Sequence, residues 1–307
     1  MPMCVFERSE KGMKFNMEKE KLESLIEIYK LPKEEHKVIL ENLKRKIFSN
    51  SRSTRTPSVM FVIGQPGCGK TTFINSLELS NYIIINSDEY RHLSKYSDEI
   101  LKKYPTYYSK LTNYDAHLWG DELFSYAVNN GYSVLREKAP VDYSLIDLIK
   151  SLKRNQELSI NVVVVNVGNL TSLIATRERY EKELLDGNNN AKLSNIEAHN
   201  KCYDILPDFI GKCIQLGVCV RYAEQINNGF KTQSVGHDYL RLLEKIRSES
   251  NIKTCLNFEN RLNDIKQSMR KRNASPQQFD EIDKIEDIYA EIMISQRKQQ
   301  KNKGEEK

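Results

Sequence analysis

The residues most able to do chemistry form one short glycine-rich segment that directly follows an apolar run. Residues 64–71 read Gly-Gln-Pro-Gly-Cys-Gly-Lys-Thr, which matches the pattern G-x-x-x-x-G-K-T at every fixed position. In such a loop the glycines let backbone N–H groups turn towards an anion, and the lysine reaches the terminal phosphates of a nucleotide. The threonine hydroxyl can bind Mg²⁺. The segment therefore predicts a nucleoside triphosphate site.

We expect the whole loop to contact the nucleotide. The predicted nucleotide-binding residues in it are Gly64, Gln65, Pro66, Gly67, Cys68, Gly69, Lys70, Thr71 and Thr72. Cys68 lies where a helix is expected to begin, a position that can lower the pKa of a thiol. We assign it no redox role, because the loop chiefly requires a small side chain there. The motif does not identify the acceptor of the γ-phosphate. If water is the acceptor, the protein is an NTPase; if a small-molecule hydroxyl is the acceptor, it is a kinase. If the nucleotide instead controls binding to a protein partner, it is a switch.

Acidic residues after the second apolar run supply candidates for the acceptor side. The run at 82–86 leads into Asn-Ser-Asp-Glu-Tyr-Arg, and ligands of α/β sheets bind beyond the carboxyl ends of the strands. Asp88 is therefore expected near the loop, where its carboxylate could accept the proton of an attacking hydroxyl, with Glu89 as the lesser candidate. Asp88 could instead cap the segment that follows. Arg91 could pair with Asp88 or bind an anionic group of the acceptor, and the sequence does not decide between these roles.

Glu137 and two arginines complete the set of candidates. Glu137 ends the third apolar run, where a carboxylate could order Mg²⁺ through water; the alternative is a surface charge. Arg177 and Arg179 lie two residues apart on a predicted helix, so they face different sides of it. One of them could reach the γ-phosphate and offset charge that develops during transfer, while the other stays solvated. Their spacing alone does not choose between them.

The order of elements around these residues predicts an α/β fold. Short runs rich in β-branched residues alternate with helical patterns, which is typical of a mostly parallel sheet with helices on both faces. We expect a P-loop NTPase-like core of about five strands. The runs lie at 58–63, 82–86, 132–136, 159–167 and 218–222, with helical patterns from the loop to about residue 79, at 114–129 and at 145–152.

Helical patterns flank this core on both sides. The predicted domains are an N-terminal helical extension at 1–50, a P-loop kinase core at 51–235 and a C-terminal helical region with a charged tail at 236–307. The C-terminal helices are expected near 237–249, 252–272 and 276–297. Another helix is expected to start near Ser194, which can form a capping box with Glu197. Pro207 is expected to kink or end that helix.

The composition excludes several classes of protein. Of the 307 residues, 39% are hydrophobic and 29% are charged, and no apolar run approaches the roughly 18 residues that a membrane span needs. The N-terminal sequence lacks the apolar segment of a signal peptide, so we expect a cytoplasmic protein without membrane contact. The six cysteines form no CxxC pair, which predicts free thiols. The formal net charge of +5 permits anionic ligands without requiring nucleic acid.

Taken in order, these segments resemble the zeta toxin family of P-loop kinases. The resemblance rests on GQPGCGKTTF, IIINSDEYR, a helix holding WGDELF, NNGYSVLRE and the RERYE helix, and it runs from about Val59 to Tyr222. It implies ATP-dependent phosphorylation of the 3′-hydroxyl of the sugar in UDP-N-acetylglucosamine, with Mg²⁺ as the metal. It also implies an antitoxin protein as the partner that holds the enzyme inactive.

The resemblance also implies roles for individual residues. The implied catalytic residues are Asp88 as the base, Lys70 on ATP and Arg179 on the transferred phosphate, which decides the choice that spacing left open. The predicted substrate-binding residues are Asp88, Glu89, Arg91, Asp121 and Glu137, of which Asp121 falls where the family uses an acid to bind the sugar nucleotide. The predicted metal-binding residues are Thr71 and Glu137.

Two positions depart from the family pattern. The family often continues its third strand as glutamate, glycine and a small hydroxyl residue with a basic residue soon after, whereas residues 137–141 here read Glu-Lys-Ala-Pro-Val. A second family arginine appears here as Lys192, another predicted nucleotide-binding residue, which keeps the charge but loses bidentate geometry. These changes affect acceptor recognition more than ATP binding, so the acceptor could be another sugar nucleotide, or the activity could be weakened or lost.

Two further interpretations stay open from the sequence. Kinases of nucleic-acid 5′ ends also combine a phosphate loop with an aspartate after the second strand, but the balanced charge and the lack of a basic, aromatic-rich stripe count against one here. A nucleotide-dependent interaction module that docks through its C-terminal helices would bind ATP without turnover. We assign no function to the helical pair at 17–48, for which inhibition in cis is one hypothesis.

Overall fold

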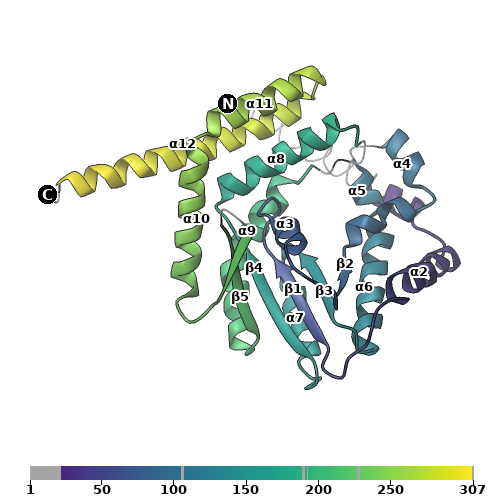
Figure 1. Cartoon of the computed structure of the whole chain (residues 1–307). Coiled ribbons are helices and arrows are strands. Elements are labelled where there is room, and N and C mark those ends of the chain that lie inside the picture. The colour runs from purple at the N-terminus through teal and green to yellow at the C-terminus, as the bar shows by residue number, and fades with distance from the viewer. Residues whose placement is uncertain (1–21, 105–106, 189–190, 192, 227–228, 306–307) are drawn as a thin grey trace, which may run out of the picture. The chain divides into compact units, whose positions relative to one another are not determined.

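Packing divides the chain into two compact units (Figure 1). The computed structural model describes residues 22–104, 107–188, 191, 193–226 and 229–305. The smaller unit comprises Met1–Arg52 and Ile85–Asn130, and the larger comprises Ser53–Ile84 and Gly131–Lys307. The helices after the sheet thus pack with it in one unit, and the segment that follows the second strand packs with the N-terminal helices.

A six-stranded sheet forms the centre of the larger unit, in the order β2-β3-β1-β4-β5-β6. The strands are β1 Ser58–Ile63, β2 Ile83–Ile85, β3 Val134–Lys138, β4 Ser159–Val165, β5 Cys219–Ile226 and β6 Gly229–Ser234. β1 pairs in parallel with β3 and β4, and β4 with β5, which confirms the predicted mostly parallel α/β fold. The prediction of about five strands missed β6, an antiparallel edge strand whose only large apolar residue is Phe230.

The central strands β1 and β4 are mostly apolar, as expected for strands covered by helices. Val62 and Ile63 of β1 and Val164 of β4 are fully buried, which is why these strands read as continuous apolar runs. The helices of the larger unit are α3 Lys70–Asn75, α7 Ser144–Leu152, α8 Asn169–Leu185, α9 Ile196–Gln215, α10 Tyr239–Cys255, α11 Phe258–Lys271 and α12 Pro276–Glu305. The helix after the loop ends at Asn75, before the predicted end near Leu79.

Helix α9 differs from its prediction at two points. Its N-cap is Asn195, whose side chain accepts from the Ala198 N–H at 3.0 Å, so the predicted capping box at Ser194 is wrong by one residue. Pro207 lies inside the helix and does not end it. A proline removes one helical hydrogen bond, and the buried face on both sides of it, which includes Leu206 and Phe209, keeps the helix together.

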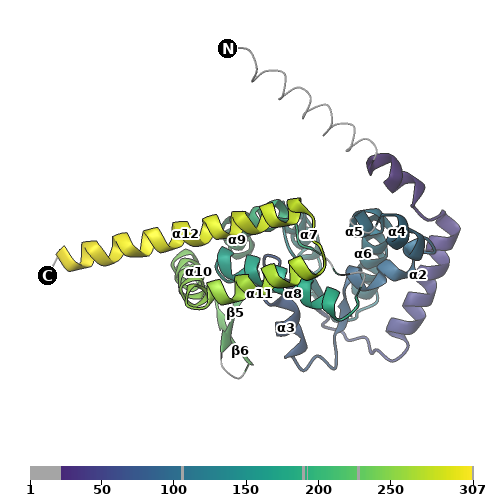
Figure 2. The ribbon, with the colours of Figure 1, turned by 90° about the horizontal axis from the view of Figure 1, so that it is seen from above.

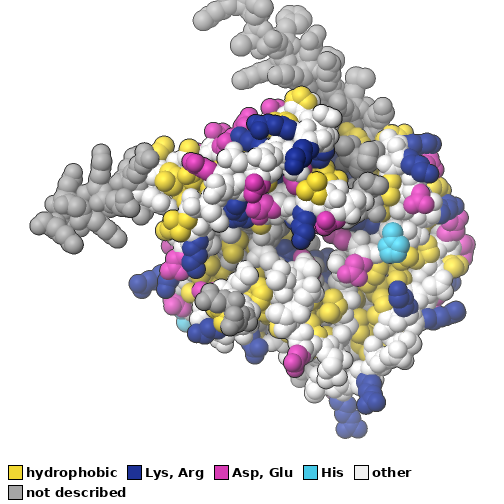
Figure 3. Space-filling view, turned by 45° about the horizontal axis from the view of Figure 1, so that its top comes forward, with side chains coloured by type: hydrophobic (Ala, Val, Ile, Leu, Met, Phe, Trp, Pro, Cys, Tyr) yellow, Lys and Arg dark blue, Asp and Glu magenta, His cyan; other side chains and the backbone are white. Residues whose placement is uncertain are grey.

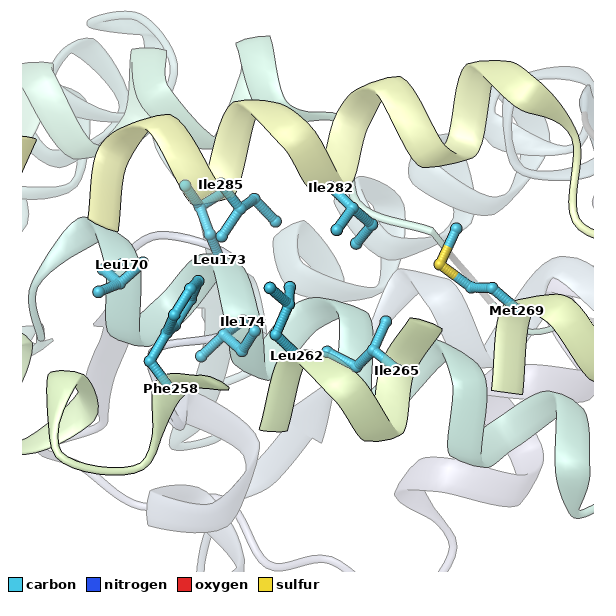
Figure 4. Close-up of a cluster of buried hydrophobic side chains, with 9 residues drawn as sticks. All are labelled: Leu170, Leu173, Ile174, Phe258, Leu262, Ile265, Met269, Ile282 and Ile285. Atoms are coloured by element: carbon cyan, nitrogen blue, oxygen red, sulfur yellow. The ribbon is translucent and has the colours of Figure 1, made fainter. Parts of the chain in front are cut away.

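The C-terminal helices share a core with α8. Figures 1 and 2 show α11 and α12 beside α8, and Figure 4 shows nine buried apolar side chains between these three helices. They are Leu170, Leu173, Ile174, Phe258, Leu262, Ile265, Met269, Ile282 and Ile285. The C-terminal region is therefore attached to the helix that carries both candidate arginines.

The smaller unit is helical. Residues 22–28 are helical, followed by α2 Lys33–Phe48, the 3₁₀ helix η1 Ser87–Leu93, α4 Ser97–Lys103, α5 Tyr108–Leu111 and α6 Asn113–Asn129. His36 of α2 stacks on the fully buried Trp119 of α6, with 5.0 Å between the ring centroids. Its Nδ1 lies 2.8 Å from an Asp115 carboxylate oxygen and its Nε2 lies 3.1 Å from one of Glu122. These contacts fix α2 on α6.

Among the helices that the structure describes, none has the length and apolar content to cross a membrane.

The cysteines of the described chain, at positions 68, 202, 213, 219 and 255, are free thiols, as the sequence predicts.

Candidate functional site

The phosphate loop joins β1 to α3 and surrounds the Lys70 ammonium group. Lys70 is the first residue of α3 and is only 7% exposed. Its Nζ donates to the main-chain carbonyls of Gly64 at 2.9 Å and Gln65 at 3.1 Å. A Glu137 carboxylate oxygen lies 3.7 Å from the same nitrogen. The loop therefore holds a cation at the start of α3, in the place where the motif puts the phosphate-binding lysine.

Two glycines of the loop are required by close packing. A Cβ at Gly64 would lie 2.0 Å from the carbonyl oxygen of Val165, at the end of β4. Gly67 has φ +79°, and a Cβ there would lie 2.1 Å from the carbonyl oxygen of Ser172 in α8. The loop thus lies directly on the end of β4 and on the first turns of α8, and any side chain at either glycine would force it away.

The register of the sheet explains why Glu137 lies beside the loop. β3 pairs with β1 so that Glu137 is level with Val62, just before the loop begins. The Thr71 hydroxyl donates to a Glu137 carboxylate oxygen at 3.1 Å. The two predicted metal-binding residues are therefore in direct contact.

The donor set of this pair suits Mg²⁺. A hydroxyl and a carboxylate are the hard oxygen ligands that Mg²⁺ prefers, and this ion is usually held by one or two protein groups together with phosphates and water. Within the described residues, no group of three or more His, Cys, Asp or Glu could hold a metal ion. Thr71 and Glu137 thus fit an ion that also needs the oxygens of a nucleotide.

Burial determines the chemistry of Cys68. Burial raises the pKa of this thiol, and the nearby Lys70 charge and the Lys70 backbone N–H lower it by less. The desolvation cost therefore exceeds the lowering that a helix start can produce, in keeping with the absence of an assigned redox role. Cys68 contributes a small buried side chain to the core under the loop.

The other candidate acids belong to the smaller unit, where Asp88 is held by Arg91. Both the Nε and an Nη of Arg91 donate to one Asp88 carboxylate oxygen, at 2.9 and 2.6 Å. Asp88 does not cap η1: its own N–H is bonded at 3.1 Å by the side chain of Asn86, which is the N-cap. The Asp88 side chain is 48% exposed. The pairing alternative for Arg91 is therefore the one seen in the structure.

The Arg91 side chain is buried and donates hydrogen bonds to several residues. It also donates to the Ser109 carbonyl at 2.7 Å, to the Thr112 hydroxyl at 3.2 Å and to the Asn113 side chain at 3.0 Å. With the two bonds to Asp88, the five N–H groups of the guanidinium all have acceptors. Its predicted contact with a substrate would require one of these bonds to be exchanged.

The remaining acceptor candidates lie on exposed positions of the smaller unit. Glu89 accepts from the Asn86 side chain at 3.1 Å. Asp121 lies on α6, where its carbonyl accepts from the Ser125 hydroxyl at 2.9 Å. The structure assigns neither residue a ligand, so their predicted substrate contacts stay predictions.

The two arginines of α8 do face different sides, as their spacing predicts. Arg177 is 3% exposed, and its guanidinium lies 2.9 Å from a Glu281 carboxylate oxygen of α12. The Arg179 side chain is 47% exposed and lies 3.6 Å from Glu183. Arg177 is thus a packing residue, and Arg179 is the arginine that a ligand can reach. Lys192 lies outside the described residues.

The family model of zeta toxin matches residues 40–228, more than half of the chain. The chain belongs to the zeta toxin family. This match covers β1 to β5, the phosphate loop and the Asp88 segment, and so agrees with the resemblance seen in the sequence. Among curated proteins, a sequence search finds no match.

A solved structure gives the same fold for this zeta toxin family member. It comes from the PezAT chromosomal toxin–antitoxin system of Streptococcus pneumoniae, has a TM-score of 0.66 at 21% identity, and the match covers 78% of this chain and 99% of that one. A second, the AvrRxo1-ORF1:-ORF2 complex with ATP, has a TM-score of 0.49 at 12% identity and covers 69% of this chain and 71% of that one.

Sequence reasoning missed one group of residues in this site. Ser172 and His199 are both fully buried, and both lie beside the loop rather than within any motif. The only signal for His199 was its place on the apolar face of a predicted helix, where a histidine is more often a packing residue. The Ser172 hydroxyl lies 3.3 Å from Gln65 Nε2 of the loop and 2.8 Å from His199 Nε2.

Proposed function

We propose that this zeta toxin family member is an ATP-dependent kinase that phosphorylates the 3′-hydroxyl of the sugar in UDP-N-acetylglucosamine. The observation that carries the proposal is the loop geometry, in which Lys70 starts α3 and Thr71 contacts Glu137 at 3.1 Å. The family match supports the kinase class. The sugar nucleotide follows from the resemblance of the motifs in sequence.

The chain's own groups suffice for the transfer step. Lys70 binds the β- and γ-phosphates by exchanging its carbonyl partners for phosphate oxygens. Thr71 and Glu137 hold Mg²⁺, which neutralises phosphate charge when bound. The sugar hydroxyl oxygen forms a bond to the γ-phosphorus while the bond from that phosphorus to the bridging oxygen breaks, so ADP leaves. Asp88 accepts the hydroxyl proton, and Arg179 offsets charge on the transferred group.

The position of Asp88 favours this role. Two hydrogen bonds from Arg91 fix one oxygen of the carboxylate. The side chain is also half exposed, so a substrate hydroxyl can approach it. Glu89 and Asp121, on the same unit, are the proposed contacts for the rest of the sugar nucleotide.

The proposal is tested by mass spectrometry of the acceptor. Purified protein is incubated with ATP, Mg²⁺ and UDP-N-acetylglucosamine, and in parallel with UDP-N-acetylgalactosamine, UDP-glucose and a 5′-hydroxyl oligonucleotide. We expect a gain of one phosphate on UDP-N-acetylglucosamine that is absent in Lys70→Ala and Asp88→Asn. If only another UDP-sugar gains phosphate, that sugar nucleotide is the acceptor. The change of specificity would then be assigned to the Glu-Lys-Ala-Pro-Val segment at 137–141. Phosphate on the oligonucleotide alone would contradict the proposal.

The face drawn in Figure 3 gives no support to a nucleic-acid acceptor. Figure 3 shows basic and acidic side chains intermixed over the face that it draws. Nucleic-acid binding surfaces gather Lys and Arg on one face. The oligonucleotide therefore serves as the control in the assay.

We further propose an antitoxin protein as the partner and the cytoplasm, where nucleotide sugars are made, as the place of action. The fold match to a protein of a toxin–antitoxin system is consistent with this partner. Growth arrest on induction of the wild-type chain, and none with Lys70→Ala, is the expected result. Equal growth of both strains would argue against a toxin.

A further inference from the structure

A buried chain of hydrogen bonds runs from the phosphate loop into α8 and α9. Gln65, the second residue of the loop, is fully buried. Its side-chain Nε2 donates to the Val167 carbonyl at 2.7 Å and lies 3.3 Å from the Ser172 hydroxyl. Because the Val167 carbonyl can only accept, the amide nitrogen of Gln65 must be the group that faces Ser172.

His199 continues this chain from α9. Its Nε2 lies 2.8 Å from the Ser172 hydroxyl, and its Nδ1 lies 2.9 Å from the Asn200 side-chain oxygen. The Asn200 oxygen accepts, so Nδ1 carries the proton. Burial lowers the pKa of His199, and the charges of Lys70 and Arg177 lower it further, so the ring is neutral and Nε2 accepts from Ser172. The Ser172 hydroxyl accepts from Gln65, and its one proton is shared between His199 at 2.8 Å and the carbonyls of Gly168 at 3.0 Å and Asn169 at 3.1 Å in its own helix.

The main chain of Gln65 connects this relay to the phosphate-binding lysine. The Gln65 carbonyl accepts from Lys70 Nζ at 3.1 Å and from the Cys68 N–H at 3.3 Å. Gln65 is therefore the residue at which the lysine, the loop backbone and the buried relay meet. A shift of its side chain would move the main chain of the loop, and with it the carbonyl that holds Lys70 before a nucleotide binds.

The start of α8, where Ser172 lies, is itself held firmly. The Gly168 N–H is bonded by the Ser250 hydroxyl of α10 at 2.6 Å, and the Thr171 hydroxyl lies 2.8 Å from that of Thr254. A Cβ at Gly168 would lie 1.9 Å from the Asn251 side-chain oxygen, so α8 and α10 are in close contact there. Ser172 is thus a fixed point against which the loop can be positioned.

We propose that Ser172 and His199 are positioning residues that hold Gln65, and through its main chain the backbone of the phosphate loop, in the nucleotide-binding conformation. Neither residue need touch the nucleotide. The proposal rests on the proposed function in one respect, namely that the loop binds ATP.

A matched pair of substitutions tests the relay. His199→Gln keeps an acceptor at the position of Nε2, towards Ser172, whereas His199→Asn keeps only a polar group at the position of Nδ1. Cys213→Ser, at another fully buried position of α9, controls for general loosening of the helix. Ser172→Ala removes the centre of the relay.

The first readout is hydrogen exchange of the loop amides in the protein without nucleotide. We expect His199→Asn and Ser172→Ala to speed exchange in the peptide covering residues 64–72 about five- to tenfold, the effect of losing one buried hydrogen bond. Peptides from β4 should not change. His199→Gln and Cys213→Ser should leave the loop peptide as in wild type.

The second readout is ATP binding and turnover. His199→Asn should weaken ATP affinity and raise KM for ATP about five- to tenfold while leaving KM for the acceptor unchanged, and His199→Gln should restore both. Equal hydrogen exchange of the loop peptide in His199→Asn and wild type would overturn the proposal. An equal loss of ATP affinity in His199→Gln and His199→Asn would also overturn it. If wild type binds no ATP but the loop peptide still responds, the proposed function fails and the positioning role stands.

Discussion

The phosphate loop and the Asp88 segment present their functional groups in opposite ways. Lys70 is 7% exposed and is held by two main-chain carbonyls of its own loop. Asp88 has a 48% exposed side chain and is held by another side chain, that of Arg91. The proposed nucleotide half is therefore built from backbone and close packing, and the proposed acceptor half from paired side chains on a helical unit.

This difference has a consequence for how each half can change. Glycines whose Cβ atoms would lie about 2 Å from neighbouring carbonyls leave the loop no alternative residues. Exposed acids such as Glu89 and Asp121 can be replaced without disturbing packing. We therefore expect acceptor specificity to vary more readily than ATP binding.

The largest effect is expected for Lys70→Ala. Removing the ammonium group takes away the phosphate contact of the loop, and transfer should fall about 10³-fold together with ATP affinity. Calorimetric titration with ATP and the mass-spectrometric transfer assay measure both quantities. Lys95→Ala, at an exposed lysine of the smaller unit, is the control and should match wild type. ATP affinity unchanged in Lys70→Ala would contradict the assignment of the loop.

The two arginines of α8 should separate activity from stability. Arg179→Met should lower kcat about 10²-fold, because the exposed guanidinium offsets charge in transfer, and should change the free energy of unfolding by less than about 0.5 kcal/mol. Arg177→Met breaks the buried pair with Glu281 and should cost about 3 kcal/mol. Urea unfolding and steady-state kinetics of both variants distinguish them. If Arg177→Met lowered kcat and Arg179→Met lowered the free energy of unfolding, the two assigned roles would be exchanged.

A smaller effect is expected for Arg91→Lys. An ammonium group has three N–H donors against the five that Arg91 uses, so the hold on Asp88 and on Ser109 is weakened. We expect kcat to fall about tenfold and the free energy of unfolding to fall by about 2 kcal/mol, with ATP affinity unchanged. Arg45→Lys, on the exposed face of α2, is the matched control. A raised KM for the acceptor with an unchanged kcat would instead support direct substrate binding by Arg91.

The smallest effect concerns pH. Burial lowers the pKa of His199 in the folded protein, so the unfolded chain binds the proton more readily as pH falls below about 6.5. The stability that this residue contributes is therefore complete above that pH and is lost as pH falls towards its folded pKa. Urea unfolding at pH 7.5 and 5.5 should show a larger loss for wild type than for His199→Gln. His237→Gln, at an exposed histidine, should behave as wild type.

Sequence patterns predicted the parts of this protein that depend on contiguous residues. The five runs became β1 to β5, and the loop, Glu137 and the opposed arginines lie as their spacing indicated. β6 was missed because an edge strand exposed on one side needs few apolar residues. Pro207 does not end α9, one of the two predicted effects, because the buried face of the whole helix outweighs the loss of one hydrogen bond.

Contacts between distant residues could not be predicted in the same way. The partners of Arg91 at 109, 112 and 113 follow from the packing of α5 and α6 against η1, which no local pattern encodes. The relay from Gln65 through Ser172 to His199 joins residues 107 and 27 positions apart. Cys68 shows the same limit, since a helix start lowers a thiol pKa only when burial does not outweigh it.

The most direct test of the division between the two halves is ATP titration of Asp88→Asn, with phosphate transfer to UDP-N-acetylglucosamine measured on the same sample. Asparagine keeps the shape of the side chain but cannot take the hydroxyl proton. We predict ATP affinity equal to that of wild type and transfer lower by about 10³-fold. Transfer at the wild-type rate, or loss of ATP binding, would contradict the claim that Asp88 acts on the acceptor and the loop on ATP.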